Sequence, residues 1–66
     1  MNPARATEMR RRLATVIALC KLAIDGIVEC DPMAEVLERL EGADEELLKT
    51  KALARRAHVE EVSNGG

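Results

Sequence analysis

The run from Leu13 to Val28 is apolar on most of its circumference when it is drawn as a helix. One stripe at helical spacing consists of Leu13, Ile17, Cys20, Ile24 and Ile27, and a second consists of Val16, Leu19, Leu22 and Ala23. A helix that is apolar on several sides is normally buried on several sides. A chain of 66 residues cannot supply that burial alone, so the sequence indicates association with a second copy or another protein.

The length allows one small domain, in the size range where a single core is marginal. Hydrophobic residues make up 47% of the chain, yet Phe, Tyr and Trp are absent. The core must therefore be built from aliphatic side chains, which favours coiled-coil-like packing. The absence of aromatic residues argues against nucleic-acid modules that stack bases.

Cysteine spacing and interrupting charges predict a cytoplasmic protein. Cys20 and Cys30 would lie about 15 Å apart along one helix, too far to form a disulfide within it. Two cysteines at this spacing are not typical of a secreted disulfide scaffold. Lys21 and Asp25 interrupt the apolar run, which is too short to span a membrane. We therefore expect no membrane partner.

The dipeptides Asn2-Pro3 and Asp31-Pro32 each combine a preferred cap with a proline suited to the first helical turn. The residue before a proline is also disfavoured inside a helix. The sequence therefore predicts a helix over about 3–29, a turn at 30–31, a helix over about 32–62 and a flexible tail at 63–66. Together these make a single helical-hairpin domain over 1–66.

Two glycines leave alternatives open. The periodicity of Ile24, Ile27 and Val28 favours a first helix that continues through Gly26, although Gly26 could instead cap it. Glycine costs on the order of 1 kcal/mol relative to alanine inside a helix. A kink or break at Gly42 is thus the alternative to one continuous second helix.

A short turn between long helices predicts an all-α antiparallel hairpin. We expect its core to consist of Leu13, Ile17, Cys20, Ile24, Ile27, Leu37, Leu40 and Leu47. The remaining stripe would then be uncovered, which predicts a dimer or partner interface of Val16, Leu19, Leu22 and Ala23. An isologous dimer of two hairpins would form a four-helix bundle.

Charge is segregated along the chain. Residues 1–21 carry five basic side chains and one acidic, residues 22–46 one basic and nine acidic, and residues 47–66 four basic and two acidic. Folding as a hairpin would gather the acids around the turn and a basic pole at the open end. That basic pole consists of Arg10, Arg11, Arg12, Arg55 and Arg56.

The search for chemistry predicts a protein that is not an enzyme and that holds no cofactor or metal. His58 is the only histidine, and two cysteines with one histidine lack the spacing of a zinc site. The glycines form no phosphate-binding loop.

We therefore expect a homodimeric regulator or inhibitor that binds a partner protein. The architecture resembles that of small helical-hairpin adaptor and regulator proteins, many encoded by bacteriophages and plasmids, in size and shape alone. One alternative is a nucleic-acid-associated regulator that uses the basic pole, against which the isoelectric point near 5.3 argues. The other is a small structural subunit of a larger complex.

Overall fold

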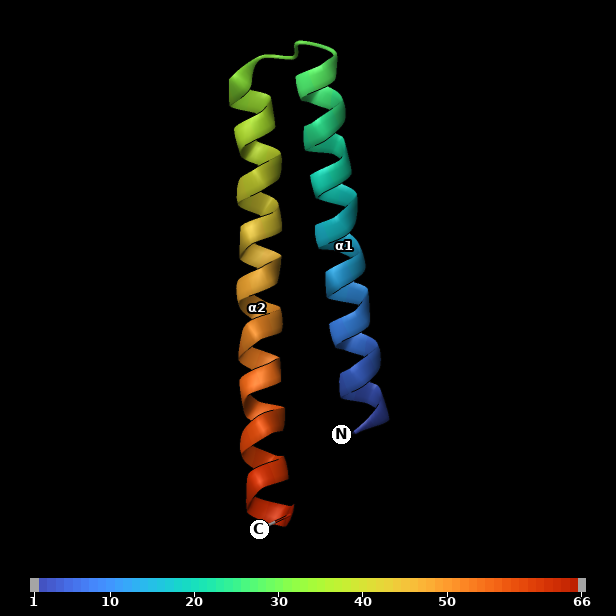
Figure 1. Ribbon diagram of the computed structural model, residues 1–66, viewed down its shortest axis with the longest axis vertical. Helices are drawn as coiled ribbons and strands as arrows, with labels where there is room; N and C mark the ends of the chain where they lie inside the picture. Colours follow the sequence, from blue (N-terminus) through green and yellow to red (C-terminus); the bar gives the residue numbers. More distant parts are fainter. Residues whose placement is uncertain (1, 66) are drawn as a thin grey trace.

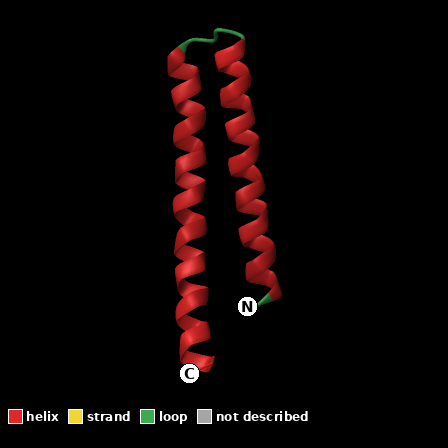
Figure 2. Ribbon diagram, in the orientation of Figure 1, coloured by secondary structure: helices red, strands yellow, loops and turns green. Residues whose placement is uncertain are grey.

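The chain folds as two long antiparallel helices joined by one short turn (Figure 1). The computed structural model describes residues 2–65, with side chains as far as Ser63. Helix α1 spans Pro3–Val28 and helix α2 spans Met33–Gly65. All other described residues are loop, as the colouring by secondary structure shows (Figure 2). The result is a rod with principal extents of 52 × 16 × 12 Å, which confirms the all-α hairpin.

Helix α1 begins at the predicted cap. The side-chain Oδ1 of Asn2 accepts a hydrogen bond from the Ala4 amide at 2.8 Å, and Pro3 occupies the first helical position. This arrangement satisfies one of the free amides at the helix start. The helix continues through Gly26 to Val28, so the interpretation of Gly26 as an early cap is wrong.

Helix α1 ends in a Schellman motif. The amide of Asp31 donates to the Gly26 carbonyl at 2.8 Å, and the amide of Cys30 donates to the Ile27 carbonyl at 3.2 Å. This pattern requires a left-handed residue after the cap, a position usually held by glycine. Here Cys30 holds it, with φ of 60°. The sharp reversal of the chain thus depends on a residue that adopts this conformation at a cost.

We expect Cys30→Gly to stabilise the hairpin by about 1 kcal/mol, because glycine enters the left-handed region without a steric penalty. The measurement is urea denaturation followed by circular dichroism at fixed protein concentration. Cys30→Ala provides the control, since it removes the thiol and keeps the strained backbone. Equal midpoints for the glycine and alanine variants would contradict this account of the turn.

Helix α2 begins one residue later than the Asp31 cap predicts. The Pro32 carbonyl accepts the amides of Glu35 and Val36, so Pro32 is the residue that precedes the helix. The carboxylate of Asp31 instead contacts Arg39, with Nη1 to Oδ2 of 3.4 Å. The cap shifts because the amide and the carboxylate of Asp31 are both engaged by groups around the turn.

The second helix is continuous, and no break occurs at Gly42. It also runs past the predicted end at residue 62. Residues 63–65, which the sequence assigned to a flexible tail, continue the helix, and the last position of that tail lies outside the described residues.

The two helices meet along a seam that repeats every three and four residues. Its α1 members are Arg5, Met9, Arg12, Val16, Leu19, Ala23 and Gly26, and its α2 members are Val36, Arg39, Ala43, Glu46, Thr50, Leu53 and Ala57. The buried positions are small or medium-sized: Ala23, Gly26, Val36, Ala43, Thr50 and Ala57. Among the described residues, none of the large side chains is fully buried. The hairpin alone therefore has only a thin core.

The predicted hairpin core is wrong. Its members Leu13, Ile17, Cys20, Ile24, Ile27, Leu37 and Leu40 are exposed, and Leu47 is half-buried. The other stripe faces α2 instead, because Ala23 and Gly26 let the two backbones approach near the turn. The seam thus contains Val16, Leu19 and Ala23, which the sequence assigned to an outside partner.

We expect Gly42→Ala to stabilise the hairpin by about 1 kcal/mol through helix propensity. Its added Cβ would lie 3.4 Å from Leu19, an ordinary contact. Gly26→Ala is the contrasting variant, because its Cβ would lie 2.5 Å from Nη1 of Arg39 and 3.2 Å from Val36. Displacing Arg39 costs charged hydrogen bonds, so we expect a net loss of about 1 kcal/mol. Urea denaturation measures both, and equal gains would contradict the close approach at Gly26.

Candidate interaction site

One side of the hairpin carries most of the exposed large aliphatic side chains. The two helices run in opposite directions, so they turn in opposite senses when viewed down the rod. As a result, the residue directly after a seam residue points to the same side of the hairpin in α1 and in α2. We call this side the apolar face and define it by Leu13, Ile17, Cys20, Ile24 and Ile27 of α1 with Met33, Leu37, Leu40 and Leu47 of α2. Seven of these side chains are between 40% and 63% exposed.

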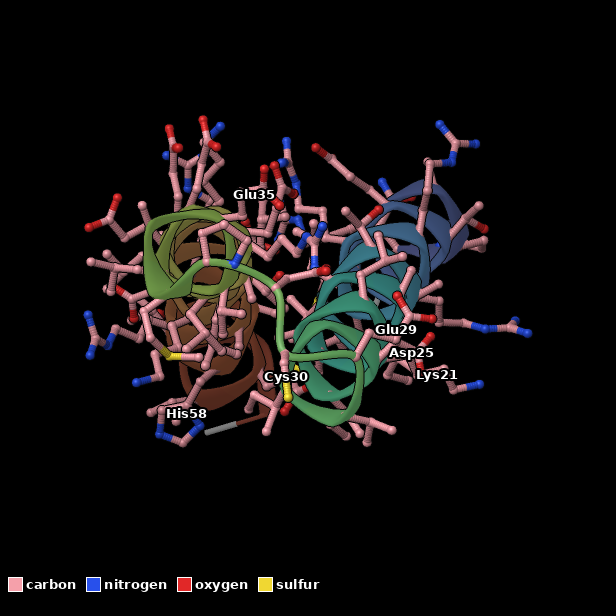
Figure 3. The ribbon with its side chains drawn as sticks, turned by 90° about the horizontal axis from the view of Figure 1, so that it is seen from above. Lys21, Asp25, Glu29, Cys30, Glu35 and His58 are labelled. Atoms are coloured by element: carbon pink, nitrogen blue, oxygen red, sulfur yellow. The ribbon has the colours of Figure 1, made fainter. Side chains whose placement is uncertain are left out.

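The opposite side of the hairpin is polar. Viewed from above the turn, Glu35 projects to one side, whereas His58 and Cys30 project to the other (Figure 3). Positions that precede seam residues include Glu35, Glu38, Glu45, Lys49 and Arg56, all exposed. We call this side the polar face. The hairpin is therefore amphipathic as a whole, as a single helix is in a bundle.

The apolar face narrows toward the open end of the hairpin. Arg10 and Lys51 come directly after the seam residues Met9 and Thr50. They lie on the same side of the hairpin as the apolar face, but they are charged. Asp44 is the one acid that falls within the aliphatic part of the α2 stripe. The aliphatic area consequently extends from Leu13 to the turn and is interrupted on α2 by Asp44.

Ion pairs across the seam fix the heights of the two helices. Nη1 of Arg12 lies 3.2 Å from Oε2 of Glu46, and Nη2 lies 3.0 Å from Oε1 of Glu8. The Nε of Arg12 is buried without a hydrogen-bond partner among the described residues. Near the open end, Arg5 pairs with Glu60. Together these contacts tie the helices at two separate levels.

Arg39 performs the same task next to the turn. Its Nη1 donates to the Leu22 carbonyl at 3.1 Å and contacts Asp31 at 3.4 Å. The guanidinium occupies the space over Gly26 that a larger residue would fill. A single arginine thus connects α1, the turn and α2.

These ion pairs shift the pKa values of the paired side chains in the direction that favours their charged forms. The hydrogen bond from Arg5 lowers the pKa of Glu60, and the corresponding bond to Glu60 raises the pKa of Arg5. In the same way, hydrogen bonds to Glu8 and Glu46 raise the pKa of Arg12. The charged forms are therefore the ones that the folded hairpin stabilises.

We expect Glu60 to titrate below the ordinary glutamate pKa of about 4.3 in the folded protein. Since the folded pKa is lowered, the stabilisation from this pair is complete above that ordinary value and is lost as the pH falls through the lowered one. Carbon-detected NMR of the side-chain carboxyl measures the titration. Arg5→Gln should raise the pKa of Glu60 toward its ordinary value, and an unchanged titration in that variant would contradict the assigned cause.

The predicted basic pole is reduced by one member. Arg12 lies in the seam and is engaged by two glutamates, so it is a structural residue. The remaining members, Arg10, Arg11, Arg55 and Arg56, stay exposed. The pole accordingly keeps four arginines at the open end of the rod.

The acidic side chains gather around the turn, as the sequence predicts. Asp25 and Glu29 point outward from α1, on the side away from α2 (Figure 3). Glu35, Glu38 and Glu41 are exposed on the first turns of α2. The rod therefore has an acidic turn end and a more basic open end.

Cys20 and Cys30 are both free and exposed. Within the described residues, no three side chains of His, Cys, Asp or Glu come together as a metal site would require. Over the same part of the chain, neither helix has a stretch apolar enough and long enough to cross a bilayer.

Comparison of the chain with protein-family models, with curated proteins and with solved structures gives no match.

Both stripes of the apolar run are visible in the sequence, but their predicted roles are reversed. The stripe predicted to form the hairpin core is exposed, and most of the stripe predicted to face a partner packs against α2. Of the predicted partner interface, Leu22 alone is substantially exposed, and it lies on the polar side of α1. The missed signal was the charge pattern: Arg5 and Arg12 share the spacing of the second stripe and have acids at matching heights on α2.

Proposed function

We propose that this protein is a non-enzymatic protein-interaction module that acts as a homodimeric regulator or inhibitor. The observation that carries the proposal is the apolar face, most of whose aliphatic side chains stay substantially exposed in the hairpin. Isolated exposed aliphatic residues are ordinary, but a continuous exposed strip marks an interaction surface.

A second copy of the chain is the occupant that fits this face. Two amphipathic hairpins that pack face to face give a four-helix bundle, which buries the aliphatic side chains of both. Covering the exposed part of one such side chain contributes roughly 1 kcal/mol. Seven of them on each copy supply the core that the isolated hairpin lacks.

The charged surfaces that remain outside the bundle would select the partner protein. Charge complementarity contributes specificity and association rate more than affinity. The acidic turn end and the basic pole offer two surfaces of opposite sign. A regulator built in this way contacts its target through the outside of the bundle.

Thermal unfolding at several protein concentrations tests the homodimer. Because dimerisation stabilises the folded state by mass action, the midpoint should rise with each tenfold increase in concentration. The measurement is circular dichroism across at least three such steps under reducing conditions. A midpoint that does not depend on concentration would overturn the proposal.

The nucleic-acid alternative predicts a different result. Tight binding to duplex DNA that weakens steeply with salt would favour it, since phosphate contacts release counterions. That binding would have to disappear when Arg10 and Arg11 become alanine. The protein-binding proposal predicts that neither the wild type nor this variant shows salt-dependent binding to DNA.

A further inference from the structure

We infer that the second copy binds head to tail, with the turn of each hairpin beside the open half of the other and Cys20 of both copies near the twofold axis. This inference rests on the proposed homodimer and adds its orientation. It follows from where the aliphatic part of the apolar face begins and ends, and from the charges that flank it.

The α1 part of the apolar face is centred on Cys20. It starts at Leu13 and ends at Ile27, each seven residues from Cys20. In an antiparallel contact between two copies of one helix, residues equally far from the axis on either side lie opposite each other. Aliphatic side chains meet aliphatic side chains along the whole stripe only when the axis passes close to Cys20.

The α2 part of the apolar face has its centre at the same height. It extends from Met33 to Leu47, so its middle is Leu40. Leu19 packs against Gly42 across the seam, which places Cys20 and Leu40 within about one helical turn of each other along the rod. One twofold axis therefore serves both helices.

The other symmetric arrangement, with the two turns together, brings like charges into contact. In that packing α1 of one copy lies against α2 of the other at equal heights. Arg10 and Lys51 both lie between the levels of the Arg12–Glu46 and Arg5–Glu60 pairs, and both continue the apolar face. Each arginine would then oppose a lysine of the other copy, and the two acidic turn ends would also be adjacent. Like charges held opposite each other disfavour an association.

The head-to-tail arrangement places these same charges at the acidic end of the second hairpin. With the axis near Cys20 and Leu40, Arg10 and Lys51 of one copy both come level with the turn of the other. That turn is flanked by Asp25 and Glu29, which project outward from the end of α1 (Figure 3). Both cations then lie near the acidic turn end of the second hairpin, and neither opposes a cation of the other copy.

The native cysteines distinguish the two orientations. Head-to-tail packing brings the two copies of Cys20 together and separates the two turns. Packing with the turns together would instead bring the two copies of Cys30 together, because Cys30 lies in the turn and projects on the side of the apolar face (Figure 3). A disulfide requires Cα atoms within about 7 Å, so oxidation reports which pair is close.

The experiment uses two single-cysteine variants of the full chain, Cys30→Gly and Cys20→Ala. Each reduced variant is first examined by sedimentation equilibrium, and a dimer of either kind supports the homodimer. Diamide is then added as the oxidant, and the covalent dimer is followed on non-reducing gels. We expect Cys30→Gly, which retains Cys20, to cross-link roughly tenfold faster than Cys20→Ala, at a rate independent of protein concentration.

The outcomes separate the orientation from the homodimer itself. Dimeric variants in which Cys30 cross-links faster, or in which the two rates are equal, overturn the head-to-tail orientation and leave the homodimer standing. A dimeric Cys30→Gly variant that fails to cross-link does the same. Monomers before oxidation would instead remove the homodimer. Adding Ile24→Glu to the Cys30→Gly variant should abolish the cross-link, which verifies that it forms inside the dimer.

Discussion

We expect Ile24→Glu to convert the proposed dimer to a monomer. Ile24 lies within the apolar face, so the dimer would bury two new carboxylates without partners, one from each copy. A buried charge that lacks a partner is strongly destabilising. We expect the dimer to weaken by at least about 100-fold, as measured by sedimentation equilibrium at micromolar concentration.

Leu22→Glu is the matched control for this substitution. Leu22 and Ile24 lie two residues apart on α1 and are 50% and 59% exposed, but they point to opposite sides of the seam. The same change at Leu22 should leave the dimer intact, since it adds a carboxylate to the polar side. Loss of the dimer in Leu22→Glu and its retention in Ile24→Glu would show that the wrong side has been assigned.

Ala43→Asp should unfold the hairpin at room temperature. Ala43 is buried in the seam and lies close to the level at which Leu19 meets Gly42. A carboxylate at this position has no partner, and the cost of several kcal/mol is comparable to the whole stability of a small domain. The expected result is loss of most of the helical circular-dichroism signal, because two separate amphipathic helices are marginal in water.

The control for this seam substitution is Ala52→Asp. Ala52 is exposed on α2, next to the seam residue Leu53 and on the polar side. Because both changes replace alanine with aspartate in the same helix, they share the same loss of helix propensity. Ala52→Asp should keep its helical signal, and equal unfolding of the two variants would contradict the assigned seam.

The elements of the fold follow from local signals in the sequence. The Asn2 cap with Pro3 placed the start of α1, and Pro32 placed the turn to within one or two residues. Gly26 and Gly42 both lie inside helices because the neighbouring aliphatic periodicity persists through them. Caps and prolines act on their immediate neighbours in the chain. The helix boundaries they set can therefore be predicted from a single sequence.

The facing of α1 could not be derived from apolar periodicity. Two stripes of similar hydrophobicity follow each other one residue apart, and both have the same spacing. The choice between them depends on pairwise fit, with Arg39 over Gly26 and Arg12 against Glu46. Such contacts connect residues that are far apart in the chain. The periodicity of one helix therefore cannot predict them.

The two stripes of α1 exchange their predicted roles, but an aliphatic stripe still remains exposed. The surface available for association is therefore the first stripe and not the second. The stripe that packs against α2 holds the smaller residues, so the large aliphatic side chains remain outside. A hairpin that buries alanines and exposes isoleucines gains more from a second copy than the sequence pattern alone suggests. The proposed partner surface is therefore the apolar face that begins at Leu13 and ends at the turn.

Sedimentation equilibrium of the reduced wild-type chain tests the central claim most directly. The account predicts that at micromolar concentrations the protein has twice the chain mass of 7.2 kDa and dissociates on dilution. A folded, helical monomer of 7.2 kDa that persists at tens of micromolar would contradict the claim that a second copy covers the apolar face.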